Sequence, residues 1–307
     1  MLPNPQAKPF LIDSGLETTL VFHENVPLRD FASFEELLSA EGRARLAAYA
    51  ERHAKIAEAH GSGFLFETAT WRASQDWGDR LGYDVETMAK INRDAVAFAR
   101  AACNDFTSRT GLPGLVTGCV GPRGDGYIAG EQMSPAEAQS YHSAQVDAFA
   151  DAGADMVGAL TMTYANEAIG IVAAAKAAGL PCAVSFTVET DGRLPNGMAL
   201  GEAIESVDRT TGNAAAFFMV NCAHPDHFRD VLAGAWRERI YGVRANASRM
   251  SHAELDAAEE LDAGNPQELG AQYAELKSLL PNLCLYGGCC GTDHRHIEAI
   301  ATTCIAA

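Results

Sequence analysis

Two adjacent cysteines, Cys289 and Cys290, are the residues of this chain best suited to carry chemistry. They follow an apolar stretch and are flanked by glycines in the run 285–292, LYGGCCGT. Glycines allow a sharp turn at a strand end, so both thiols can point into one cleft. A third cysteine, Cys222, ends a second apolar stretch, 217–222. Three thiolates with an open fourth position are typical of a catalytic zinc site, so we expect these cysteines to bind Zn²⁺.

Other uses of these cysteines are less favourable. A disulfide between adjacent cysteines is strained, and one between Cys222 and either partner is disfavoured in a chain that we expect to be cytosolic. His224 and His227 follow Cys222 and form a competing metal set, but we expect them to cap or line the next helix. The remaining cysteines are expected to be small buried hydrophobic residues: Cys103, Cys119, Cys182, Cys284 and Cys304.

Short β-type runs alternate with longer alanine-rich helical stretches along the whole chain. Eight such units predict a closed (β/α)8 barrel, a TIM barrel, formed as a single domain over residues 1–307. The alternative, a doubly wound open sheet, would place a glycine-rich dinucleotide loop after the first strand, and the chain has none there. The predicted strands are 10–13, 64–67, 115–119, 156–160, 182–187, 216–222, 240–243 and 283–286. The predicted helices include 43–60, 85–107, 135–152, 167–178 and 267–280, with longer loops after strands one, five and seven.

The active site of such a barrel lies at the carboxyl ends of its strands. Polar and sulfur-bearing residues gather at these ends in the predicted fold, which favours a functional use for them. They are Asp13, Glu67, Thr68, Thr70, 118–125, Cys222, Asn246, Cys289 and Cys290.

These motifs resemble the homocysteine S-methyltransferase family. Its zinc is bound by one cysteine of an Asn-Cys element and by both cysteines of a Gly-Gly-Cys-Cys-Gly element, which match 221–222 and 287–291. The resemblance extends from 12–15, similar to the family's opening Asp-Gly-Gly, to 291–297. It implies a zinc-dependent enzyme that moves a methyl group from a sulfonium or quaternary ammonium donor to a thiol, homocysteine, to give methionine.

The implied chemistry follows from the behaviour of thiols. A free thiol is mostly protonated at neutral pH, whereas zinc removes its proton and leaves a nucleophilic thiolate. The thiolate then displaces the donor in line, and no general base is needed at that step. We therefore expect no catalytic residue beyond the zinc site.

The binding site for the acceptor departs from the family pattern. The family assigns to Asp13 the binding of the acceptor's ammonium group. Most members have a second carboxylate after strand four, where this chain has Leu160. Glu67 could supply that charge from strand two, or it could pair with Arg72 as a structural ion pair. Both alternatives stay open at this point.

Further substrate contacts are implied near strands two, three and seven. Thr68 begins a segment similar to the family's Thr-Asn-Thr-Tyr, and Trp71 could form an aromatic surface for a methylated cation. We expect Trp77 and Tyr83, in the same region, to be packing residues. A Gly-Pro turn at Gly121 could offer backbone amides to an acceptor carboxylate, although its proline argues against a phosphate loop. Asn246 closes strand seven.

The net charge of -17 argues against partners that require a basic surface. Nucleic acids and anionic membranes are therefore not expected. The chain shows no signal-peptide pattern and no apolar run of bilayer length, so a cytoplasmic enzyme is expected. Its expected partners are the small-molecule acceptor and donor, and assembly into a homo-oligomer stays open. The rival functions are a zinc-thiolate hydrolase or lyase and a noncatalytic metal or small-molecule binding barrel.

Overall fold

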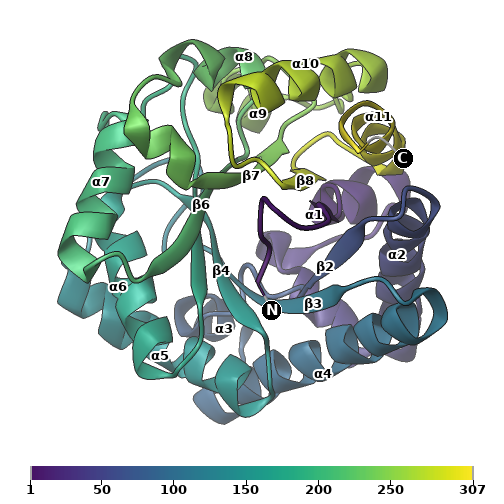
Figure 1. Cartoon of the computed structure of the whole chain (residues 1–307). Helices are drawn as coiled ribbons and strands as arrows, with labels where there is room; N and C mark the ends of the chain where they lie inside the picture. The colour runs from purple at the N-terminus through teal and green to yellow at the C-terminus, as the bar shows by residue number, and fades with distance from the viewer. Residues whose placement is uncertain (1, 306–307) are drawn as a thin grey trace.

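A closed barrel of eight parallel strands forms the centre of the molecule, with strand order β1 to β8 around the ring (Figure 1). The computed structural model describes residues 2–305. The strands are β1 Phe10–Leu11, β2 Gly63–Glu67, β3 Gly114–Val120, β4 Met156–Met162, β5 Cys182–Phe186, β6 Ala215–Asn221, β7 Ile240–Ala245 and β8 Leu285–Gly288. The (β/α)8 prediction is confirmed, and every predicted strand overlaps an observed one.

Helices surround the barrel and connect successive strands (Figure 1). The longer helices are α2 Ala40–Ala59, α4 Val85–Thr110, α5 Pro135–Asp151, α6 Ala165–Ala177, α7 Leu200–Thr211, α10 Pro266–Leu279 and α11 His294–Cys304. The shorter ones are α1 Leu16–Thr18, α3 Gln75–Leu81, α8 Pro225–Phe228 and α9 His252–Ala257. Short segments of π-helix or 3-10 helix are η1 Thr19–His23, η2 Arg29–Phe31, η3 Ser33–Leu38, η4 Arg229–Val231 and η5 Ala235–Arg239.

Local sequence signals set the ends of several helices. The Ser134 side chain accepts from the Glu137 amide, and Glu137 bonds back to Ser134, a capping box with Pro135 in the first turn of α5. Helix α4 ends at Thr110 and is capped by Gly111, whose φ of +69° is accessible to glycine without a Cβ clash. These signals fix where α5 begins and where α4 ends.

Side chains fill the interior of the barrel, so the barrel is not a pore. One cluster points inward from most of the strands and includes Phe10, Leu65, Leu115, Met156, Phe217 and Leu285. A larger cluster packs the outer faces of the strands against the helices. Strands β4 and β5 are buried along their whole length, as expected when helices cover a parallel sheet.

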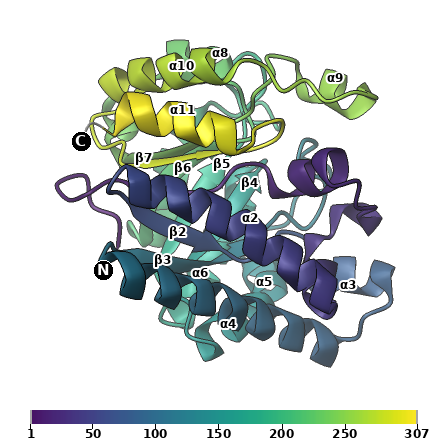
Figure 2. The same cartoon turned by 90° about the vertical axis from the view of Figure 1, so that its right-hand side faces the viewer.

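The connections after β1, β5 and β7 are long, as predicted, and those after β1 and β7 contain α1 and α9. Figure 2 shows α3 and α9 projecting at one end of the barrel. Among the described residues, none of the helices has the length and apolar character needed to span a bilayer.

Candidate metal and substrate site

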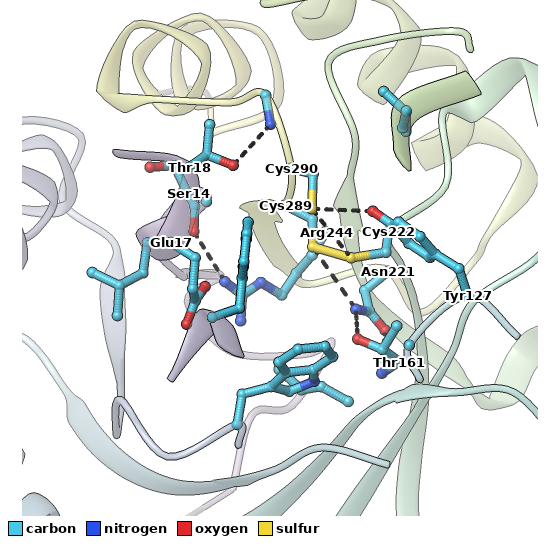
Figure 3. A pocket seen from close by; sticks show the side chains of 18 of the residues that line it. Ser14, Glu17, Thr18, Tyr127, Thr161, Asn221, Cys222, Arg244, Cys289 and Cys290 are labelled. Carbon is cyan, nitrogen blue, oxygen red and sulfur yellow. Dashed lines mark hydrogen bonds between the residues drawn. A yellow bond between two sulfur atoms is a disulfide. The ribbon is translucent and has the colours of Figure 1, made fainter. Parts of the chain in front are cut away.

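Three cysteine sulfurs meet at the carboxyl end of the barrel. Cys222 follows β6, and Cys289 and Cys290 follow β8. Strand β7 pairs with both of these strands, which places the three residues around its end. Their sulfur atoms all lie within 4.8 Å of one another (Figure 3).

The backbone at Cys222 and at the neighbouring Thr161 is held in an unusual conformation. Cys222 has φ of +52° and Thr161, on β4, has φ of +61°, values that are uncommon for residues other than glycine. The side chain of Asn221 accepts from the Thr161 amide at 2.9 Å and donates to the Thr161 hydroxyl at 2.8 Å. Such conformations persist only where the surroundings fix them, and they cluster at functional sites.

Close packing around the Cys289–Cys290 turn requires small residues. A Cβ at Gly15 would lie 2.6 Å from the carbonyl oxygen of Cys289, and a Cβ at Gly288 would collide with the side chain of Thr292. The Cys289 amide donates to Ala245 at 2.9 Å. The glycines and these backbone contacts fix where the two thiols point.

The structure joins Cys222 and Cys289 in a disulfide, and Cys290 stays free. The sulfur of Cys290 lies 3.9 Å from that of Cys222. The expectation that a disulfide between Cys222 and either partner is disfavoured is therefore wrong for this structure. The physical reason is proximity, because thiols placed to share one ion are also within reach of each other.

Two side chains near the sulfurs were not predicted from the sequence. The Tyr127 hydroxyl lies 3.3 Å from the Cys290 sulfur, and the Tyr127 ring stacks on His252 with centroids 4.0 Å apart. His252 Nε2 lies 2.8 Å from the carbonyl oxygen of Cys222. The only sequence signal for Tyr127 is an aromatic residue in the glycine-rich loop after β3.

An arginine that the sequence reasoning missed lies at the end of β7. Arg244 Nη2 donates to Asp13 at 2.6 Å, and Arg244 Nη1 forms an ion pair with Glu67. Burial raises the pKa of Asp13 to about 6, although Arg244 acts to lower it. The Arg72 pairing considered for Glu67 is wrong, since Arg72 donates to the Asp30 carbonyl and its guanidinium lies 3.9 Å from the centre of the Trp77 ring.

A cavity of about 380 Å³ joins the sulfur atoms to the charged side chains. Its volume falls in the range of small-molecule sites. Seven carboxylates and two guanidinium groups line it, so the cavity is acidic. The charged lining residues are Asp13, Glu17, Glu67, Asp125, Asp256, Glu260, Asp262, Arg72 and Arg244.

The other predicted contacts divide into two groups. Thr68 and Trp71 line the cavity, whereas Gly121 and Asn246 are not among the described residues that line it. The Gly121 amide donates to the Trp71 carbonyl at 3.0 Å, so the prediction that it contacts the acceptor is wrong in this conformation. Asn246 is buried, and its backbone N–H donates to the Ala223 carbonyl at 3.1 Å.

The two histidines that follow Cys222 serve structural roles. His224 caps α8, with its Nδ1 accepting from the Asp226 amide, and burial lowers the pKa of His224 to about 4. His227 Nε2 lies 2.9 Å from the Arg249 carbonyl. Both are outside the group of described residues that could share an ion with the cysteines.

Comparison with known proteins places this site in a family. The model of the homocysteine S-methyltransferase family matches residues 10–304. The chain belongs to this family. The prediction of an S-methyltransferase is therefore confirmed at the level of the family. No individually curated protein sequence matches the chain.

Two solved structures with the same fold carry the name of one enzyme. They are the oxidized and metallated forms of the homocysteine methyltransferase MmuM from Escherichia coli. The oxidized form has a TM-score of 0.78 and 19% identity, and the metallated form has a TM-score of 0.74 and 20% identity. Each comparison covers 97% of this chain and 96% of the other.

Proposed function

We propose that this homocysteine S-methyltransferase family member is zinc-dependent and transfers a methyl group from a sulfonium or quaternary ammonium donor to a small thiol. The observation that carries the proposal is the convergence of three cysteine sulfurs within 4.8 Å on an acidic cavity. Once the disulfide is reduced, Cys222, Cys289 and Cys290 offer the donor set that Zn²⁺ prefers in a catalytic site.

The residues fit the metal on chemical grounds. Burial raises the pKa of the Cys290 thiol, so this thiol resists ionisation unless a cation is present. Zinc bound there would supply the charge that turns an acceptor thiol into a thiolate at neutral pH. Tyr127, whose hydroxyl lies 3.3 Å from the Cys290 sulfur, is placed to donate to the thiolate of Cys290.

The transfer is a displacement in which the acceptor thiol loses its proton to solvent. Its sulfur forms a bond to the methyl carbon while the donor's bond to that carbon breaks, and the bonding pair leaves with the donor. The chain's own contribution is to orient the two reactants in the cavity. The excess of carboxylates around the cavity favours a cationic donor over a neutral or anionic one.

A metal-loading and methylation panel tests this function. Reduced protein is loaded with zinc and incubated with homocysteine or 2-mercaptoethanol and with one of four donors: S-methylmethionine, S-adenosylmethionine, glycine betaine or dimethylsulfoniopropionate. Mass spectrometry should detect a methylated thiol with at least one donor, only when zinc is present. Failure of every pair with a zinc-loaded protein would contradict the proposal.

A further inference from the structure

We propose that the physiological acceptor is a thiol without a free ammonium group, because Arg244 already occupies the two carboxylates that could bind one. This inference rests on the proposed function and names the substrate class of that same site. It is carried by the ion pairs of Arg244 with Asp13 and Glu67. Arg244 lies beside the cysteine sulfurs (Figure 3).

The donors of Arg244 are almost fully used inside the protein. Nε donates to the Gly288 carbonyl at 3.1 Å, and Nη2 donates to Asp13 at 2.6 Å and to the Ser14 carbonyl at 3.2 Å. Nη1 donates to Glu67. A guanidinium has five N–H groups, so these four contacts leave one. Arg244 is therefore built into the wall of the cavity.

The three charged side chains are also withdrawn from water. The exposed fraction of the side chain is 7% for Arg244, 14% for Asp13 and 8% for Glu67. An incoming ammonium would have to displace the guanidinium from a carboxylate. Removing one partner from a buried ion pair is strongly unfavourable, because the other charge is left without compensation. These carboxylates are therefore poor sites for a substrate cation.

Strand β4, all of whose residues the structure describes, supplies no carboxylate that could bind the ammonium in place of Glu67. Leu160 lines the cavity at the end of β4, and it is 6% exposed. Its Cδ2 atom and Glu67 Oε1 lie 3.9 and 4.0 Å from the position that a Cβ would take at Gly158. Leu160 therefore adds an apolar group to the wall near Glu67, which suits an uncharged part of the acceptor.

The remaining carboxylates of the cavity have other surroundings. Asp125 lies on the connection after β3, and Asp256 (in α9), Glu260 and Asp262 lie on the connection after β7. All four are beyond the strand ends, where they suit a cationic donor. Glu17 accepts from the Ser33 hydroxyl at 2.7 Å. Among the described residues that line the cavity, Glu17 is thus the one carboxylate near the strand ends that is not paired with Arg244. It could bind an acceptor ammonium, so the experiment must address it.

Titration of cobalt-loaded protein with matched thiols tests the inference without a methyl donor. Reduced protein is loaded with Co²⁺, and the cobalt–thiolate absorption is followed as each thiol is added. Homocysteine and 4-mercaptobutanoate differ only in the amino group, and so do 3-mercaptopropylamine and 1-propanethiol. The Cys290→Ser variant controls for cobalt bound elsewhere.

We expect the member of each pair that lacks the amino group to bind at least as tightly as its partner. A charge-assisted contact to the ammonium would instead favour the amino thiol by roughly tenfold to a hundredfold. Homocysteine binding more than about threefold tighter than 4-mercaptobutanoate would overturn the inference. Loss of such a preference in Glu17→Gln would assign the ammonium to Glu17 and would also overturn it. If none of the four thiols changes the cobalt spectrum, the proposed function fails, and the inference fails with it.

Discussion

The sulfur side and the charged side of the cavity are held in place by different means. Backbone geometry positions the thiols, through the positive φ of Cys222 and the glycines around Cys289. Side-chain pairing positions the charges, through the contacts of Arg244 with Asp13 and Glu67. The comparison teaches that the reactive end of the site is fixed by the fold, whereas the recognition end can change through single substitutions at strand ends.

Removing one thiol should have the largest effect. In Cys290→Ser, zinc content should fall from about one ion per chain to near zero, because two thiolates hold zinc far less tightly than three. Methyl transfer should fall at least about a hundredfold, since several kcal/mol of catalysis depend on the metal. Cys304→Ala, at a buried free cysteine of α11, is the matched control and should keep its zinc. Equal zinc content in the two variants would show that Cys290 is not a zinc ligand.

Oxidation should inactivate the sulfur side reversibly. Peroxide should join Cys222 to Cys289 and release zinc, because their sulfurs are already within bonding reach. Reductant with zinc should restore activity, and reductant with a chelator should not. Peptide mapping would identify the disulfide. Full activity and zinc content after peroxide treatment would show that the bound metal closes the site to oxidants.

Breaking the ion pairs of Arg244 should lower the stability of the fold more than it lowers zinc binding. Arg244→Met leaves two buried carboxylates without their partner, which should lower the free energy of unfolding by about 3–5 kcal/mol. Adding Glu67→Gln should recover part of the loss, because it removes one of the two unpaired charges. Chemical denaturation of the single and double variants measures the coupling. Arg72→Met is the control, and it should cost less because the Arg72 guanidinium pairs with an aromatic ring and a carbonyl. An undiminished stability of Arg244→Met would show that the ion pairs do not hold this side together.

The smallest effect concerns a histidine behind the charged side. His53 Nε2 lies 2.9 Å from the Ser14 hydroxyl, and burial lowers the pKa of His53 to about 4. Since an unfolded histidine titrates near 6.5, neutral His53 stabilises the fold above that pH. This contribution should fall away as the pH drops from about 6.5 to 4, by up to about 3 kcal/mol. His224 contributes in the same direction, so His53→Gln should flatten the acid slope of the unfolding free energy in part. An unchanged slope would contradict the assignment.

The sequence was sufficient to predict the barrel and the sulfur set. Apolar runs separated by helical stretches gave all eight strands, although β1 ends at Leu11, where its pairing with β2 and β8 ends. The glycines beside the cysteines marked the turn after β8, and the structure brings Cys289 and Cys290 to Cys222. Both kinds of signal are local, so they can be read without knowing the packing.

The charged side could not be predicted in the same way. Arg244 is 231 residues from Asp13 and 177 from Glu67 in the sequence, and only closure of the barrel brings them together. The available signal was an arginine in the otherwise apolar strand β7. A buried charge normally needs a partner, and two carboxylates at neighbouring strand ends were candidates. The pairing of Cys222 with Cys289 was missed because the redox argument considered the compartment and not the distance between the sulfurs.

X-ray absorption at the zinc edge tests the central claim most directly. Reduced, zinc-loaded protein should show three sulfur ligands and one lighter atom, and addition of 2-mercaptoethanol should replace the lighter atom with a fourth sulfur. That result would establish that Cys222, Cys289 and Cys290 bind the metal and that the open position takes the acceptor thiol. Histidine ligands, fewer than three sulfurs, or a spectrum unchanged by a saturating thiol would contradict the account.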